Sequence, residues 1–209
     1  MARGEHSNGL ALLRPPAHHA IAAVSMGFCL VNHVAIAARA LQAAGLAGKV
    51  AIVDFDVHHG NGTEDIFAAD PEVFYASSHQ YPHYPGTGRA GDRGVGPGEG
   101  FTLNVPLRAG AGDAELLSAW RDTIVPAVED FGPDFLIVSA GYDGHRDDPL
   151  AGLEATTDGL TGIGRLLIDL AGRCCGGKVV FNVEGGYELS ALSACVSEAA
   201  ALLIEAGER

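Results

Sequence analysis

The residues most able to do chemistry lie in one short segment, positions 54–62, which reads Asp-Phe-Asp-Val-His-His-Gly-Asn-Gly. An apolar run precedes it, and in an α/β protein this pattern predicts a buried strand that opens into a site at its carboxyl end. Asp56 and His58 are two positions apart, so on an extended backbone their side chains point to the same side. A carboxylate oxygen and an imidazole nitrogen that converge suit a divalent metal, zinc above all. The alternative is a solvated turn that binds nothing.

Three further segments carry polar side chains in otherwise apolar surroundings: residues 14–20, 139–150 and 183–187. They offer a third metal ligand in Asp143, an acid–base pair in His18 and His19, and a hydrogen-bond donor in Tyr187. For any one segment alone, a structural role explains the residues at least as well. Because all of them fall at predicted strand ends, together they indicate a metal site with acid–base groups beside it.

The elements that must position these residues alternate between strands and helices. The predicted strands are residues 50–54, 73–77, 102–105, 135–139 and 179–183. The predicted helices are residues 26–44, 63–69, 113–130, 156–174 and 188–205. Strands that alternate with helices form βαβ units, so we expect a mostly parallel sheet covered on both faces, a three-layer αβα architecture. A glycine-rich loop at residues 79–100 contains Tyr81 and Tyr84 and is expected to form the wall of a pocket.

Composition narrows the classes of function. The chain has 209 residues, 47% of them hydrophobic, so we expect one core and a single domain over residues 1–209. The net charge of −13 argues against nucleic-acid binding, which needs clustered cations. No apolar run reaches the ~20 residues of a membrane span, and the N-terminus lacks the layout of a signal peptide. The four cysteines show neither disulfide nor zinc-ribbon spacing, which favours the reducing cytoplasm.

Six motifs follow one another along nearly the whole chain. They are Arg-Pro-Pro-x-His-His at 14–19, Asp-x-Asp-x-His-His-Gly-Asn-Gly at 54–62, Tyr-Pro-Gly-Thr-Gly at 84–88, Ser-Ala-Gly-Tyr-Asp at 139–143, Asp-Pro-Leu at 148–150 and Glu-Gly-Gly-Tyr at 184–187. The set resembles the zinc-dependent histone deacetylase family, which includes bacterial acetylpolyamine amidohydrolases and acetoin-utilisation proteins. Asn61 and the Glu-Gly-Gly ending are closer to the class II branch than to class I. The resemblance implies an arginase/deacetylase-like fold.

The resemblance also implies a role for each matching residue. One zinc ion would be held by Asp56, His58 and Asp143. His19 would act as general base and then general acid, with His18 as its electrostatic partner. Asp54 would orient His18 and Asn61 would orient His19, which fixes the tautomer of each ring. Tyr187 would donate a hydrogen bond to the tetrahedral oxyanion.

Two further sets of residues are implied by the same resemblance. The walls of a narrow channel that admits an acylated amine would be Gly27, Phe28, Tyr84 and Leu150. A structural potassium ion would lie among the backbone of Asp54, Asp56 and His58, together with Ser77.

The arginases share this fold, and their two-metal centre requires a further carboxylate two residues after the strand-end histidine. That position is Gly60 here, so we expect one metal and amide deacetylation rather than guanidine hydrolysis.

The chain departs from the family in two respects. Family domains are longer before Arg14, so we expect the N-terminal strands to be missing. Ala17 replaces a glycine, and we expect its methyl group to crowd the channel floor or the acetate pocket slightly.

We therefore expect a zinc-dependent hydrolase that releases acetate, or another short acyl group, from an acylated amine such as acetyl-lysine or an acetylpolyamine. The alternative is a non-catalytic truncated paralogue, or a gene fragment, that retains metal binding. The intact Tyr187 and His19 favour the enzyme, whereas the shortened N-terminus favours the remnant. Loss of the first strands would expose an edge of the sheet and leave side chains of the 26–44 helix uncovered, so a homo-oligomer is also expected.

Overall fold

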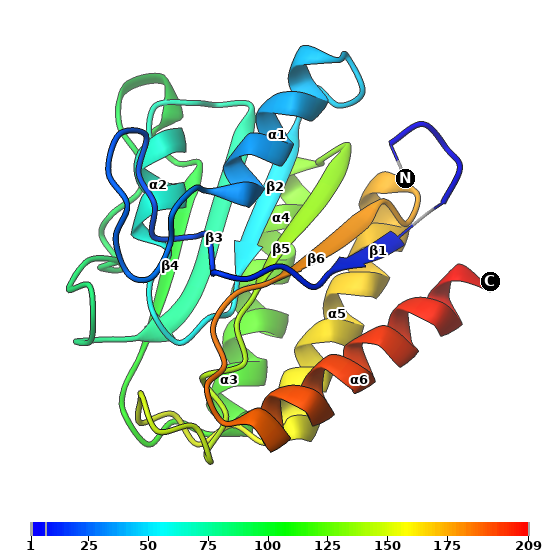
Figure 1. Cartoon of the computed structure of the whole chain (residues 1–209). Helices are drawn as coiled ribbons and strands as arrows, with labels where there is room; N and C mark the ends of the chain where they lie inside the picture. Colours follow the sequence, from blue (N-terminus) through cyan, green and yellow to red (C-terminus); the bar gives the residue numbers. More distant parts are fainter. Residues whose placement is uncertain (1, 7, 209) are drawn as a thin grey trace.

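Six parallel strands form one sheet in the order β1-β6-β5-β2-β3-β4 (Figure 1). The computed structural model describes residues 2–6 and 8–208. The strands are β1 (Asn8–Ala11), β2 (Val50–Asp54), β3 (Val73–Gln80), β4 (Thr102–Leu107), β5 (Phe135–Ala140) and β6 (Val179–Val183). Every neighbouring pair is parallel, which confirms the predicted sheet. β3 and β4 continue further than predicted, to Gln80 and Leu107.

Helices cover both faces of the sheet, as predicted, and the alternation of side chains along each strand separates the two cores (Figure 1). On one face, Val50 and Ile52 of β2 pack with α1 (His33–Ala43) and α2 (Asn61–Phe67). On the other, Ala51 and Val53 belong to the core formed with the later helices. Those helices are α3 (Asp113–Ser118), η2 (Ala119–Ile124), α4 (Val125–Phe131), α5 (Thr157–Cys175) and α6 (Leu189–Gly207). A 3₁₀ turn, η1 (Gly96–Gly98), lies within the long loop.

Two predicted helices differ from those observed. The helix predicted at 26–44 begins only at His33, because Gly27 and Phe28 have φ values of 54° and 66°, outside the right-handed helical region. Asn32 caps the observed helix by accepting a hydrogen bond from the Ala35 amide at 3.0 Å. The helix predicted at 113–130 is interrupted by the π-helical turn η2, since Pro126 has no N–H to continue the α-helical bonding.

β1 was not predicted from the sequence, whereas α6, on which it packs, is the helix predicted at 188–205. β1 precedes Arg14 and forms the edge of the sheet beside β6. Its Asn8 side chain donates to the Leu203 carbonyl of α6 at 2.8 Å, which ties the edge strand to the last helix. By length and composition alone α6 could cross a membrane, with a hydropathy of 1.5. A helix that packs on the core of a domain passes the same test, and α6 packs on α5 and β1.

Candidate metal site and catalytic pocket

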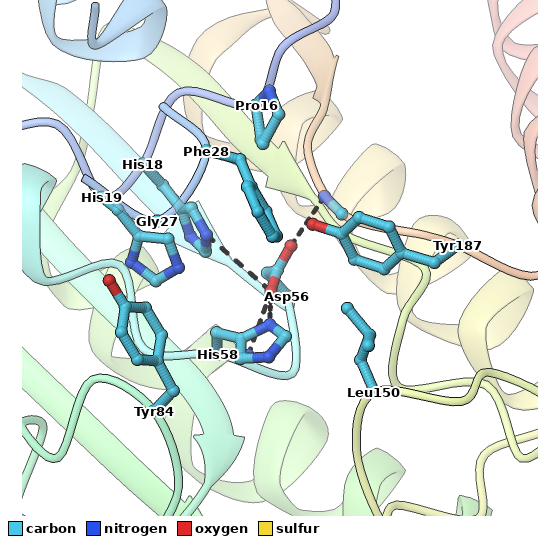
Figure 2. A pocket seen from close by; sticks show the side chains of 11 residues that line it. Pro16, His18, His19, Gly27, Phe28, Asp56, His58, Tyr84, Leu150 and Tyr187 are labelled. Carbon is cyan, nitrogen blue, oxygen red and sulfur yellow. Dashed lines mark hydrogen bonds and ion pairs between the residues drawn. The ribbon is translucent and has the colours of Figure 1, made fainter. Parts of the chain in front are cut away.

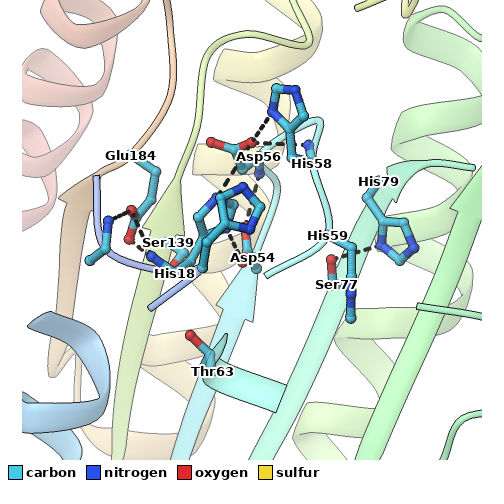
Figure 3. A network of polar contacts seen from close by, with 12 residues as sticks. His18, Asp54, Asp56, His58, His59, Thr63, Ser77, His79, Ser139 and Glu184 are labelled. Atoms are coloured by element: carbon cyan, nitrogen blue, oxygen red, sulfur yellow. Dashed lines mark hydrogen bonds and ion pairs between the residues drawn. The ribbon is translucent and has the colours of Figure 1, made fainter. Parts of the chain in front are cut away.

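The polar segments singled out in the sequence meet at the carboxyl ends of the central strands. Asp54, the last residue of β2, lies in register with Ser77 of β3 and with Ser139 of β5. Strand β6 ends beside β5 in the same parallel sheet, so residues 184–187 emerge at the same edge. The loop that carries His18 and His19 crosses this edge, as Figures 1 and 3 show.

Asp56, His58 and Asp143 converge as predicted, with one ligand atom from each within 4.8 Å of the others. The Nδ1 atom of His58 lies 3.1 Å from a carboxylate oxygen of Asp56 and 3.0 Å from one of Asp143. Burial, together with the Asp56 charge, raises the pKa of Asp143 to about 7. Two buried carboxylates beside one imidazole fit a divalent cation, because a positive charge between them offsets their repulsion.

Backbone groups fix the orientation of both carboxylates. The Gly185 amide donates to Asp56 at 2.8 Å, and the Val57 amide donates to Asp143 at 3.0 Å. Gly141 and Gly185 leave no room for a side chain, since a Cβ at either position would collide with the Asp56 carboxylate. These glycines belong to the site, and their place in the strand-end motifs was the signal that could have identified them.

His18 and His19 lie side by side, with ring centroids 4.1 Å apart. Asp54 holds Nδ1 of His18 at 2.9 Å, and Asn61 holds Nδ1 of His19 at 2.8 Å, so both predicted pairs are formed. Burial alone would lower the pKa of His18, but the carboxylates of Asp54 and Asp56 outweigh it and raise that pKa well above its usual value. Burial and the charge on His18 lower the pKa of His19 to about 3. The pair therefore consists of a cation beside a neutral imidazole at neutral pH.

Glu184 anchors the histidine loop, a role that the sequence did not predict. Its carboxylate accepts hydrogen bonds from the backbone amides of Ala17 and His18, and from the side chains of Ser139 and Asn182. Ala17 is fully buried beside this carboxylate and is not among the residues that line the pocket. The expectation that its methyl group crowds the channel floor is therefore wrong.

A pocket of about 40 Å³ opens above the candidate metal ligands Asp56 and His58 (Figure 2). It is lined by Pro16, His18, His19, Gly27, Phe28, Asp56, His58, Tyr84, Leu150, Gly185 and Tyr187. All four predicted channel residues are in this set. Tyr84 packs edge-on to His19 with centroids 5.2 Å apart, and Phe28 packs against Tyr187 at 6.1 Å. Aromatic rings therefore form most of the wall between solvent and the polar floor.

Arg14 and Asp148 hold Tyr187 in place, and neither was predicted to act in the site. The Arg14 guanidinium lies 5.4 Å from the Tyr187 ring centroid and donates to the carbonyl groups of Glu184 and Gly186. The Asp148 carboxylate accepts from the Tyr187 amide at 2.6 Å. Burial raises the pKa of the Tyr187 hydroxyl, so that this group stays protonated and can donate a hydrogen bond.

Comparison with known proteins identifies relatives of this chain and of its fold. A family model described as the histone deacetylase domain matches residues 1–203. Histone deacetylase 14, chloroplastic, from Arabidopsis thaliana is 49% identical over 190 residues, which are 91% of this chain and 45% of that protein. Histone deacetylase 15 from the same plant is 45% identical over 205 residues, or 96% of this chain and 36% of that protein.

Solved structures show the same fold. The crystal structure of the HDA15 HD domain superposes with a TM-score of 0.93 at 44% identity, covering 98% of this chain and 57% of that one. Acetylpolyamine aminohydrolase from Burkholderia pseudomallei superposes with a TM-score of 0.88 at 37% identity, covering 96% and 57%.

A parallel sheet between two layers of helices, with a carboxylate–imidazole cluster at its strand ends, defines an α/β protein of the arginase/deacetylase fold with a candidate metal centre. Within that class, the chain belongs to the histone deacetylase domain family. It spans less than half the length of the two plant relatives described above.

Proposed function

We propose that this chain catalyses zinc-dependent hydrolysis of an acylated amine, as part of one deacetylase catalytic domain over residues 1–209. The observation that carries the proposal is one small pocket lined by two candidate metal ligands, Asp56 and His58, together with a neutral histidine, a charged histidine and a tyrosyl hydroxyl. The third candidate ligand, Asp143, lies 3.0 Å from Nδ1 of His58. The arrangement suits an amide, whose carbonyl is a weak electrophile and whose amine is a poor leaving group.

Zinc held by Asp56, His58 and Asp143 would polarise the acyl carbonyl and lower the pKa of a water molecule at the site. Beside it, neutral His19 accepts a proton from the attacking water and returns it to the departing amine. Asn61 keeps the proton-accepting atom of His19 turned toward the pocket. The Tyr187 hydroxyl donates to the oxygen that becomes negative in the tetrahedral state.

The size of the pocket supports a short acyl group. A small pocket of about 40 Å³ suits a short acyl group better than a long one. We propose acetyl-lysine, an acetylpolyamine or a similar small acylated amine as the substrate class. The name of the Burkholderia pseudomallei neighbour supports an acylated amine, and the names of the plant relatives support a deacetylase.

Potassium remains a proposal for a second, structural cation. The proposed site is the backbone of Asp54, Asp56 and His58 with the Ser77 hydroxyl. Its support is that Asp54 and Ser77 are fully buried and directly opposite in neighbouring strands. The Ser77 hydroxyl bonds Nδ1 of His79 at 2.9 Å and keeps an oxygen lone pair for a cation. The cytoplasm likewise remains the proposed compartment, with no nucleic acid or membrane as partner.

Acetate release by the purified zinc-loaded protein tests the proposed function. We expect turnover of an acetyl-lysine peptide or an acetylpolyamine. In the variant Tyr187→Phe, which removes one oxyanion donor and keeps the ring, turnover should fall roughly 10²–10³-fold. Absence of acetate release from both substrates, in protein that binds one zinc ion, would favour the non-catalytic paralogue. Near-native turnover in Tyr187→Phe would overturn the role of the hydroxyl.

A further inference from the structure

His59, the residue after the candidate metal ligand His58, is not among the described residues that line the pocket and is nevertheless almost completely buried. The two side chains diverge: His58 meets Asp56, whereas His59 turns toward β3 and lies beside His79, with ring centroids 4.7 Å apart (Figure 3). The mechanism proposed above uses His58 and leaves His59 without a task. A buried imidazole of this kind needs partners for both nitrogens.

The partners of His59 come from two different segments. Its Nδ1 atom lies 2.8 Å from the Thr87 hydroxyl, in the long loop, and its Nε2 atom lies 3.0 Å from the Glu64 carboxylate, in α2. A neutral ring with the proton on Nε2 satisfies both contacts, since it donates to the carboxylate and accepts from the hydroxyl. Asn104 of β4 donates to the same carboxylate oxygen at 2.6 Å, which holds Glu64 in place from the other side.

Close packing adds to these hydrogen bonds. The Gly88 carbonyl accepts from Nε2 of His79 at 2.8 Å, directly after Thr87 in the chain. A Cβ on Gly88 would collide with the rings of both His59 and His79, and its φ of 84° also favours glycine. Residues 87 and 88 of the loop therefore pack directly against the imidazole rings of His59 and His79.

The segments joined in this way both reach the pocket. Three residues before Thr87, the Tyr84 ring packs edge-on to His19 at 5.2 Å and to His58 at 6.2 Å. At the start of α2, three residues before Glu64, Asn61 bonds Nδ1 of His19. The contacts of His59 thus connect the aromatic wall of the pocket to the helix that orients the proposed base.

We propose that Thr87, His59 and Glu64 form a clamp that positions the Tyr84 wall of the channel against His19 and so sets how tightly the acylated amine is held. The three are positioning residues that act through Tyr84, and the clamp rests on the proposed function for its effect on substrate. The competing explanation is a part-buried polar network around His59 that stabilises the fold only.

Thr87→Val and Thr87→Ser form the matched pair that separates these explanations. Valine keeps the shape and removes the hydroxyl, whereas serine keeps the hydroxyl. For Thr87→Val we expect KM for an acetyl-lysine peptide to rise about tenfold, as for the loss of one hydrogen bond. We expect kcat and zinc content to stay within about twofold of the wild-type values, because the substitution changes no candidate metal ligand and no proton-transfer group. Thr87→Ser should restore KM.

Two further variants sharpen the test. In a Tyr84→Ala background the effect of Thr87→Val on KM should shrink to less than about twofold, since a residue that acts through Tyr84 has nothing left to position. Thr161→Val is the control, because the Thr161 hydroxyl is buried in α5 and has no hydrogen-bond partner among the residues that the structure describes. It should leave KM unchanged. An unaltered KM in Thr87→Val, or an equal effect with and without Tyr84, would overturn the clamp.

Amide hydrogen exchange over residues 81–100 provides a readout that needs no activity. We expect faster exchange in this segment in Thr87→Val and wild-type protection in Thr87→Ser. If wild-type protein releases no acetate, the proposed function fails, and hydrogen exchange decides the clamp alone. Unchanged protection in Thr87→Val would overturn the clamp even in an active enzyme.

Discussion

At the scale of single residues, the candidate metal centre depends on Asp143 because this ligand comes from β5 whereas the other two come from the end of β2. Asp143→Ala should abolish both zinc binding and acetate release, since two of three protein ligands hold zinc weakly. Metal analysis of purified protein checks this, with one zinc ion per chain expected in the wild type. Two metals per wild-type chain would contradict the inference from Gly60 that a second bridging ligand is lacking.

His19 should matter for turnover and little for metal binding. Its pKa of about 3 keeps it neutral at pH 7, the form that accepts a proton. His19→Ala should lower kcat by roughly two to four orders of magnitude, the range for general acid–base catalysis, with zinc content unchanged. Steady-state kinetics alongside metal analysis provides the measurement. Loss of zinc in this variant would instead mean that His19 helps to hold the metal ligands in position.

At the scale of elements, α1 begins at a cap that also holds the histidine loop. Asn32 accepts from Ala35, and its amide donates to the Ala20 carbonyl at 3.2 Å and to the Thr63 hydroxyl at 3.1 Å. Asn32→Ala should lower the free energy of unfolding by about 2–3 kcal/mol, because it removes the cap and orphans a buried carbonyl. Urea unfolding measures this.

Asn32→Asp is the matched control for that prediction. Aspartate keeps the oxygen that caps α1 but turns a second acceptor oxygen toward the Ala20 carbonyl, so it should remain clearly less stable than the wild type although the cap is intact. Equal stability of wild type and Asn32→Ala would mean that water replaces all three contacts.

The strands that could be predicted from the sequence are those whose own composition identifies them. β2 and β5 are apolar runs that end in polar residues, and the structure has them within a residue of the predicted ends. β1 has only two apolar side chains among its four residues and exists through pairing with β6, which local pattern does not reveal. Pro126 was the available signal for the break between α3 and α4.

The residues of the candidate site likewise fall into those that could be predicted from the sequence and those that could not. Asp56, His58 and Asp143 stand at strand ends, so a parallel sheet was enough to bring them together. Glu184 bonds residues 166 and 167 positions away, and such contacts depend on how loops cross the sheet edge. The neighbours of His59 were missed for the same reason, although the residue itself lies in the most informative motif.

At the scale of the whole molecule, apolar side chains remain exposed near the pocket, as predicted. They are Phe28 at 71%, Leu30 at 66%, Val31 at 50% and Ile36 at 59%. A hollow of about 560 Å³ beside them is lined largely by apolar residues from 21–36. We expect this chain, expressed alone, to associate or aggregate, because a contiguous apolar surface of this kind favours burial.

Light scattering tests that expectation. The double variant Leu30→Glu and Ile36→Glu should shift the chain toward monomer, since it places charge in the apolar surface. Ile204→Glu, at an exposed position of α6 away from this surface, is the control for added charge alone. A wild-type chain that is monomeric at high concentration would contradict the expectation.

The order of strands in the sheet has a consequence for synthesis of the protein. β5, which supplies Asp143, lies between β2 and β6, and Gly185 after β6 bonds Asp56 from 129 positions away. Such pairing is slow because the intervening chain must be closed into loops first. During translation the ligands at 56 and 58 therefore emerge long before their partners. We expect that a nascent chain released before residue 187 captures zinc poorly, so that loading of the metal reports completion of the fold.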